Sequence, residues 1–203
     1  AMEESHDSTI GEGYTDRLQD RRGHAWKRLL PDPYRRNIRR LNLGRTLDVG
    51  CGIGRCLAFV DGNGVGVDHN PTSVGVCRGR GLEAYVPEDF QLSDRGLFDS
   101  LLLSHVLEHM DEDAGVSLIS SYLRSLRPSG KILVITPQAA GQRSDPTHVR
   151  LIGEHEVSRL FGRLGVELES ARSFPFPRPV GRFFTYNETV VTGVLRGEAS
   201  GGD

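Results

Sequence analysis

Cysteine, lysine and long apolar runs are all scarce in this sequence of 203 residues, and each scarcity excludes something. The three cysteines, Cys51, Cys56 and Cys77, form no C-x-x-C pair, which argues against a disulfide framework and for a reducing compartment. No apolar run approaches the roughly 20 residues that a membrane-spanning helix needs, and the first residues are polar where a signal peptide would be apolar. We therefore expect a cytoplasmic protein without a membrane span.

Positive charge rests almost entirely on arginine, because Lys27 and Lys131 are the two lysines among 25 basic residues. The formal net charge of -2 gives no sign of a nucleic-acid partner. Arginines gather between residues 17 and 45, where they could bind an anionic ligand or form the solvated face of a helix, and we favour the solvated face. The expected partner is a small molecule or an oligosaccharide rather than nucleic acid, with a homodimer left open.

Short apolar runs alternate with helical patterns along most of the chain, which predicts a doubly wound α/β sheet. Ligands of such sheets bind at the carboxyl ends of the strands, so the residues that follow strands are the functional candidates. Residues 14–38 predict two helices that are broken and restarted by Pro31-Asp32-Pro33. The predicted strands are 46–49, 64–68, 82–86, 99–104, 131–136, 166–174 and 188–195, and the main predicted helices are 70–80, 113–126 and 154–164.

The stretch from Thr46 to Arg55 predicts a strand that ends in a glycine-rich turn, Gly50-Cys51-Gly52-Ile53-Gly54. Alternate glycines allow a sharp turn and a close approach to a ligand, and the N–H groups beyond them are free to donate. A dinucleotide fingerprint would place the third glycine one residue later. Asp48 would repel a pyrophosphate but could satisfy an ammonium group, and Asp68 could accept the hydroxyls of a ribose. A plain strand-to-helix turn is the simpler alternative.

A second unusual feature is the run His105-Val-Leu-Glu108-His109. If it opens a helix after the fourth strand, positions i, i+3 and i+4 share one face, which is ligand-like spacing for a divalent ion. Downstream, Asp145-Pro-Thr-His148 brings another histidine to the same edge of the sheet. Together His105, Glu108, His109 and His148 could supply four ligands, of types that suit zinc or manganese better than Mg²⁺. Side chains that merely brace the start of a helix are the alternative.

Four motifs, in order, resemble class I S-adenosylmethionine-dependent methyltransferases: Asp48–Gly54, Val65–Asp68, Phe98–His109 and Leu126–Val134. The resemblance covers about residues 44–136. It implies a single Rossmann-like domain over residues 44–196, with a seven-stranded mixed sheet, an antiparallel last strand and helices on both faces. Residues 1–43 would form an N-terminal tail and helical lid, and residues 197–203 a disordered tail.

The same resemblance implies how S-adenosylmethionine would be held. The methionyl part would lie near the glycine turn, the ribose on Asp68 with His69 beside it, and the adenine near Asp89 and Phe90, with Glu88 as the alternative. The residues expected to contact the cofactor are Asp48, Gly50, Cys51, Gly52, Gly54, Asp68, His69, Asp89, Phe90 and Ser104.

Family members that methylate ribose hydroxyls of small RNAs, or catechol-like precursors, bind a metal through an E-x-x-E-H run, and the RNA enzymes add a downstream histidine. Here His105 stands in place of the first glutamate, which keeps a ligand but removes a negative charge. The resemblance implies a divalent metal, Mg²⁺ or similar, that lowers the pKa of a substrate hydroxyl. The general base would be His148, His109 or His105.

The segment from Ser173 to Asn187 is rich in aromatic residues and proline, which suits the face of a sugar or a flat ring but equally suits a sheet edge. Together with Asp145–His148 it resembles small saccharide O-methyltransferases, including those that methylate mannosides in methylmannose polysaccharide synthesis. The predicted function is methyl transfer to a hydroxyl of a sugar or oligosaccharide. The alternatives are a metal-free methyltransferase of aromatic or polyketide natural products and a non-catalytic cofactor-binding protein. Residues predicted to contact the acceptor are Tyr14, Arg178, Arg182 and Tyr186.

Overall fold

A computed structural model describes residues 32–91 and 96–196. Their strands form one seven-stranded sheet in the order β3-β2-β1-β4-β5-β7-β6, in which β7 runs antiparallel to both of its neighbours and the other pairings are parallel. This confirms the predicted Rossmann-like sheet with an antiparallel last strand. The strands are β1 Thr46–Val49, β2 Gly64–Val67, β3 Ala84–Tyr85, β4 Phe98–Ser104, β5 Leu126–Pro137, β6 Val166–Phe174 and β7 Glu188–Leu195.

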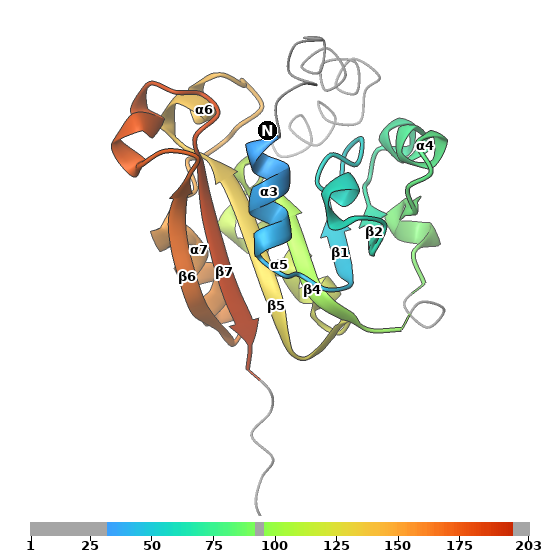
Figure 1. Cartoon of the computed structure of the whole chain (residues 1–203). Coiled ribbons are helices and arrows are strands. Elements are labelled where there is room, and N and C mark those ends of the chain that lie inside the picture. The colour runs from blue at the N-terminus through green and yellow to red at the C-terminus, as the bar shows by residue number, and fades with distance from the viewer. Residues whose placement is uncertain (1–31, 92–95, 197–203) are drawn as a thin grey trace, which may run out of the picture.

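Helices cover both faces of the sheet, with α3 on the near face and α5 and α7 behind it in Figure 1. Several connections are single turns of 3₁₀-helix rather than full α-helices. The α-helices are α3 Pro33–Arg40, α4 Pro71–Gly79, α5 Glu112–Leu123, α6 Ala139–Arg143 and α7 Glu154–Arg163, and the 3₁₀-helices are η2 Leu57–Val60, η3 Pro87–Asp89, η5 Leu107–His109 and η6 Arg178–Arg182.

The central strands are buried on both faces because their apolar residues alternate between two cores. Leu101 and Leu103 of β4 belong to the core that α5 and α7 cover, together with Leu160. Leu102, between them, packs in the second core with Ile38 of α3. This division explains why a continuous apolar run, rather than an alternating one, predicted β4.

The predicted boundaries differ from the structure mainly where a turn could not be recognised. Strand β5 begins at Leu126, five residues before its predicted start, because Leu126 already pairs with Phe98. The predicted polar loop at 137–150 contains the short helix α6, and the helix expected after Gly54 is the single turn η2. Helix α3 begins at Pro33, as predicted, and the Asp32 side chain caps it by accepting from the Tyr34 N–H. The helix predicted before it, and Tyr14, lie outside the described residues.

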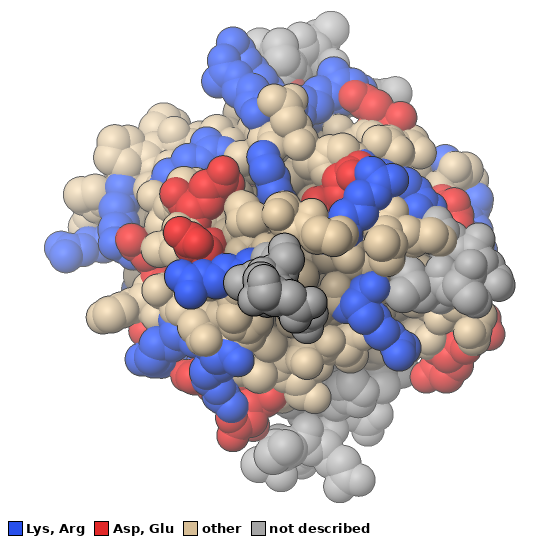
Figure 2. Space-filling view, turned by 90° about the horizontal axis from the view of Figure 1, so that it is seen from below, with Lys and Arg blue, Asp and Glu red and all other residues tan. Residues whose placement is uncertain are grey.

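The carboxyl ends of the parallel strands lie at the top of Figure 1, where α3, α4 and α6 surround them. The opposite end, seen in Figure 2, carries interspersed basic and acidic side chains among its described residues. None of the helices in the described parts of the chain combines the length and the apolar character that crossing a bilayer would require. Because ligands of doubly wound sheets bind at the carboxyl ends of the strands, the candidate site lies at the upper edge.

Candidate active site

The glycine turn after β1 is held tightly against the end of β4. Gly50 has a φ of 74°, and a Cβ added to it would lie 2.4 Å from Cγ2 of Val106. Gly54 has a φ of 75°, and its Cβ would lie 2.6 Å from Cδ1 of Leu82. Both positions have a left-handed backbone that favours glycine, and a side chain at either would also force a neighbouring side chain to shift.

A hollow opens beside this turn, with an empty volume of about 720 Å³ that includes its open mouth. It contains five of the ten residues predicted to contact the cofactor, namely Asp48, Gly50, Cys51, Gly52 and Ser104. Other residues of the lining were not predicted from the sequence. They are Tyr34, Asn37 and Ile38 of α3, Arg55 and Phe59 after the turn, and Glu188 at the start of β7. Pairing of β7 with β5 brings Glu188 here, and that pairing leaves no local motif in the sequence.

Asp48 is the most unusual group in the hollow. The residue is 1% exposed, and neither of its carboxylate oxygens has a hydrogen-bond partner. Burial raises the pKa of Asp48 to about 7, and the nearby charge of Asp68 adds to this effect. The Leu57 N–H favours the charged form, but it is not placed to form a hydrogen bond with the carboxylate. A buried carboxylate without a partner is costly unless a cation satisfies it. The arrangement fits a ligand that carries an ammonium or sulfonium group.

Asp68 has a different environment from the one expected. Its two carboxylate oxygens accept the Gly52 N–H at 2.7 Å and the Asn70 N–H at 2.9 Å, so the residue braces the glycine turn. Each oxygen keeps a further lone pair, so contact with a ribose stays a prediction. His69 lies beside it, with Nδ1 3.8 Å from the carboxylate.

The predicted adenine contacts lie away from the hollow. Asp89 is exposed, and Phe90 packs against Phe98 and Tyr122, with ring centroids 6.5 Å and 6.0 Å away. Gly54 also lies outside the lining. The adenine contact of Asp89 and Phe90 therefore stays a prediction.

His105 does not open a helix, which corrects the expectation from its spacing. Its φ is 58°, a left-handed conformation, and the 3₁₀-helix η5 begins two residues later. Its ring lies between two carboxylates, with Nδ1 3.2 Å from Glu108 Oε1 and Nε2 2.9 Å from Glu188 Oε1. Burial lowers the pKa of His105, but the two carboxylates outweigh it and raise the pKa to about 10. The ring is thus directed at two carboxylates rather than at the other predicted ligands, and the roles of His105 as metal ligand and base stay predictions.

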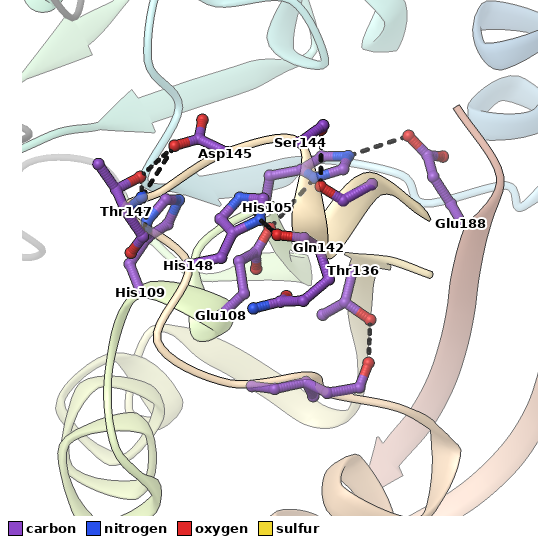
Figure 3. Close-up of polar contacts among 12 residues, drawn as sticks. His105, Glu108, His109, Thr136, Gln142, Ser144, Asp145, Thr147, His148 and Glu188 are labelled. Atoms are coloured by element: carbon purple, nitrogen blue, oxygen red, sulfur yellow. Dashed lines mark hydrogen bonds and ion pairs between the residues drawn. The ribbon is translucent and has the colours of Figure 1, made fainter. Parts of the chain in front are cut away.

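The other three predicted ligands do come together (Figure 3). Glu108, His109 and His148 each offer a ligand atom, and these atoms lie within 4.8 Å of one another. Nδ1 of His148 faces the Gln142 carbonyl at 3.2 Å, and Nδ1 of His109 faces the Thr147 carbonyl at 3.2 Å. Donation from Nδ1 leaves the lone pair of each ring on Nε2, the arrangement typical of metal-bound histidine.

Charge and burial also favour a cation at this cluster. Glu108 is fully buried, and its Oε2 has no hydrogen-bond partner. Its Oε1 lies 3.2 Å from His105 Nδ1 and 4.0 Å from His148 Nε2. Burial lowers the pKa of His109, although the nearby Glu108 opposes this effect. We call Glu108, His109 and His148 the triad below.

The aromatic segment between β6 and β7 is anchored by a buried amide. Asn187 is 0% exposed, and its Nδ2 lies 2.9 Å from Ser173 Oγ and 3.0 Å from Gln138 Oε1. Of the predicted acceptor contacts, Tyr186 is 55% exposed and its carbonyl accepts the Tyr34 hydroxyl at 2.5 Å. Arg178 pairs with Glu154 at 3.6 Å, and the Arg182 carbonyl accepts from Arg143. Their contact with an acceptor stays a prediction.

We expect Asn187→Ala to lower the free energy of unfolding by about 2 kcal/mol, because it leaves buried acceptors without a donor. The exposed Asn63→Ala is the matched control and should change stability by less than about 0.5 kcal/mol. Urea unfolding of both variants measures the difference. Equal small effects would mean that the amide does not anchor the segment.

We expect stability to fall as the pH rises from about 7 to about 10, because His105 holds its proton up to about pH 10 in the folded chain. A histidine whose pKa is raised on folding stabilises the fold fully below its unfolded-state pKa, and this contribution is lost as the pH rises through the folded-state value. His105→Gln cannot titrate, so it should be less stable at pH 7 and show a flatter dependence. Urea unfolding at pH 7 and pH 10 tests this, with the exposed His155→Gln as control. A slope unchanged in His105→Gln would rule out the imidazolium.

Comparison with known proteins agrees with this geometry. A family model described as a methyltransferase domain matches residues 18–179. No protein of curated function matches the chain. Magnesium protoporphyrin IX methyltransferase from Synechocystis, solved with bound S-adenosylhomocysteine, is 15% identical with a TM-score of 0.65, covering 94% of this chain and 97% of that one.

Two further solved structures share the fold. A putative methyltransferase from Haloferax volcanii, in complex with the Trm112 activator, is 18% identical with a TM-score of 0.64 and covers 94% of this chain and 97% of that one. The N-methyltransferase NodS from Bradyrhizobium japonicum is 16% identical with a TM-score of 0.61 and covers 80% of this chain and 94% of that one. With the family model covering most of its length, the chain belongs to the methyltransferase-domain family and is an S-adenosylmethionine-dependent class I methyltransferase.

Proposed function

We propose that the protein methylates a hydroxyl of a sugar or oligosaccharide, with a divalent ion bound at the triad. The observation that carries this proposal is the meeting of Glu108, His109 and His148 at the carboxyl edge of the sheet, where the glycine turn also lies. His105 joins the two places, because its ring contacts Glu108 of the triad and Glu188 of the hollow. A methyl donor in the hollow and an acceptor at the triad would therefore be neighbours.

The cofactor, when bound, supplies a methyl group on a positively charged sulfur. The chain's own residues fit its methionyl end, because Asp48 offers an unpartnered carboxylate to the hollow and Gly50 and Gly52 expose backbone beside it. Arg55 also lines the hollow and would suit the carboxylate of an amino acid. Asp68 keeps the turn in shape through the Gly52 N–H.

The triad suits activation of a hydroxyl. A divalent ion, when bound there, supplies positive charge that lowers the pKa of the hydroxyl beside it. Glu108 would contribute the negative charge, and the Nε2 atoms of His109 and His148 the neutral donors. In the metal-free alternative, one of these two imidazoles, whose ring centroids are 4.9 Å apart, would accept the hydroxyl proton directly.

The test is transfer of a labelled methyl group from S-adenosylmethionine to two panels of acceptors, neutral saccharides and catechol-like or polyketide aromatics. We expect labelling of a saccharide hydroxyl that is lost with chelator and restored by Mg²⁺ or Mn²⁺. Labelling confined to aromatic acceptors, and unaffected by exhaustive metal removal, would contradict both the acceptor and the ion. Binding of the cofactor without any transfer would favour a non-catalytic binding protein.

A further inference from the structure

Two buried oxygens near the triad have no hydrogen-bond partner. They are Glu108 Oε2 and Gln142 Oε1. In residues 32–91 and 96–196, the other buried side-chain atoms without a partner are both carboxylate oxygens of Asp48 and Nη2 of Arg150. Buried acceptors are nearly always satisfied in folded proteins, so each exception points to a group that would satisfy it. Gln142 belongs to none of the predicted functional residues.

Gln142 already touches the triad through its backbone. Its carbonyl lies 3.2 Å from Nδ1 of His148, whose Nε2 lies 4.0 Å from Glu108 Oε1. Figure 3 shows the Gln142 side chain turning back below the His148 ring and pointing toward Glu108. Helix α6 thus presents both a carbonyl that orients one ligand and an amide oxygen without a partner.

We propose that Oε1 of Gln142 is the fourth protein ligand of the divalent ion, in the place that the sequence pattern gave to His105. This proposal rests on the proposed function, because it requires an ion at the triad. Carboxylate and carboxamide oxygens are ligands of hard cations, and two of them beside two imidazoles shift the preference toward Mn²⁺ or Mg²⁺ and away from zinc. Both ring nitrogens of His105 already face carboxylates, Glu108 and Glu188, and His105 is not part of the cluster of Glu108, His109 and His148.

One alternative uses the same contacts. If instead the amide nitrogen of Gln142 donates a hydrogen bond to Glu108, no oxygen of that amide faces the ion. Gln142 would then orient a ligand without being one. The two arrangements differ in what a carboxylate at position 142 does, because a carboxylate can replace a ligand oxygen but cannot donate to Glu108.

The test is calorimetric titration of Mn²⁺ alone into metal-free wild type, Gln142→Met and Gln142→Glu. Methionine matches glutamine in length without the oxygen, so we expect Gln142→Met to weaken Mn²⁺ binding by about 10-fold or more. Gln142→Glu should bind within a few-fold of wild type or more tightly. Arg143→Met, the exposed neighbour on α6, is the control and should bind like wild type.

Water-proton relaxation of the bound Mn²⁺ gives a second readout, because a lost protein ligand is replaced by water. We expect higher relaxivity per bound Mn²⁺ in Gln142→Met than in wild type, with the same melting temperature in the absence of metal. If Gln142→Met binds Mn²⁺ with wild-type affinity and relaxivity, Gln142 is not a ligand, although the ion at the triad would stand. If both Gln142→Met and Gln142→Glu bind Mn²⁺ more weakly, the amide of Gln142 donates to Glu108 and does not bind the ion. Absence of Mn²⁺ binding to wild type would overturn the ion itself.

Discussion

Replacing Asp48 with asparagine should stabilise the cofactor-free protein at pH 8 while weakening its binding of cofactor. The effects on stability and on cofactor affinity should have opposite signs, because Asp48 is 1% exposed and neither of its oxygens has a hydrogen-bond partner. Its negative charge therefore destabilises the fold until a cation binds beside it. An ordinary structural carboxylate would behave differently, since its removal would destabilise the fold. The pair of measurements therefore separates a ligand-binding acid from a structural one.

The pH dependence gives the size of the effect. The pKa of Asp48 is raised from 3.8 in the unfolded chain to about 7 in the folded chain. Protonated Asp48 therefore stabilises the fold fully below its unfolded-state pKa, and this stability is lost as the pH rises to about 7. Asparagine does not titrate. The difference in unfolding free energy, variant minus wild type, should therefore grow by about 2.6 kcal/mol between pH 5 and pH 8.

Cofactor affinity should fall by about 10- to 100-fold in the same variant, the loss typical of a hydrogen bond to a charged group. Calorimetry with S-adenosylmethionine and S-adenosylhomocysteine measures it, and Glu167→Gln on the exposed face of β6 is the control. Asp48→Asn with wild-type affinity and reduced stability at pH 8 would contradict the role of this carboxylate.

Turnover should fall by about 10²- to 10⁴-fold in His148→Gln, the range expected when a proton acceptor or the residue that positions it is lost. His148 lies outside the hollow, so S-adenosylhomocysteine should bind as in wild type. His155→Gln is the matched control because that histidine is exposed on α7 and belongs to no cluster of possible ligands in the described residues.

The measurement is labelled methyl transfer to the acceptor found in the panel experiment, together with the melting temperature of each variant. Turnover of His148→Gln within about two-fold of wild type would remove His148 from the chemistry. An equal loss in His155→Gln would show that the effect is not specific to the triad.

The fold was predictable because its signals are local. The glycine turn, the apolar run of β4 and the helix start at Asp32-Pro33 each depend on neighbouring residues, and each is found near its predicted place. The seven-stranded mixed sheet and its antiparallel last strand came from the family resemblance and are confirmed, whereas the strand order was not predicted. The start of β5 was missed because Ser129 adopts a φ of 59°, a conformation that its residue type does not announce.

The site was predictable in part, for the same reason. Glu108, His109 and His148 meet as their spacing and strand positions suggested, whereas His105 does not join them. The helical spacing argument failed because His105 has a φ of 58°, a left-handed conformation that a right-handed helix does not contain, and η5 begins two residues later. Glu188 and Gln142 were missed because tertiary contacts alone bring them to the site.

Anomalous scattering from crystals grown with Mn²⁺ and S-adenosylhomocysteine tests the central proposal most directly, because it locates the ion and the cofactor sulfur together. We predict a manganese peak bound by Glu108, His109 and His148, and a sulfur in the hollow beside Asp48 and Gly50. A manganese peak elsewhere, no peak at the triad, or a cofactor bound away from the glycine turn would contradict the account.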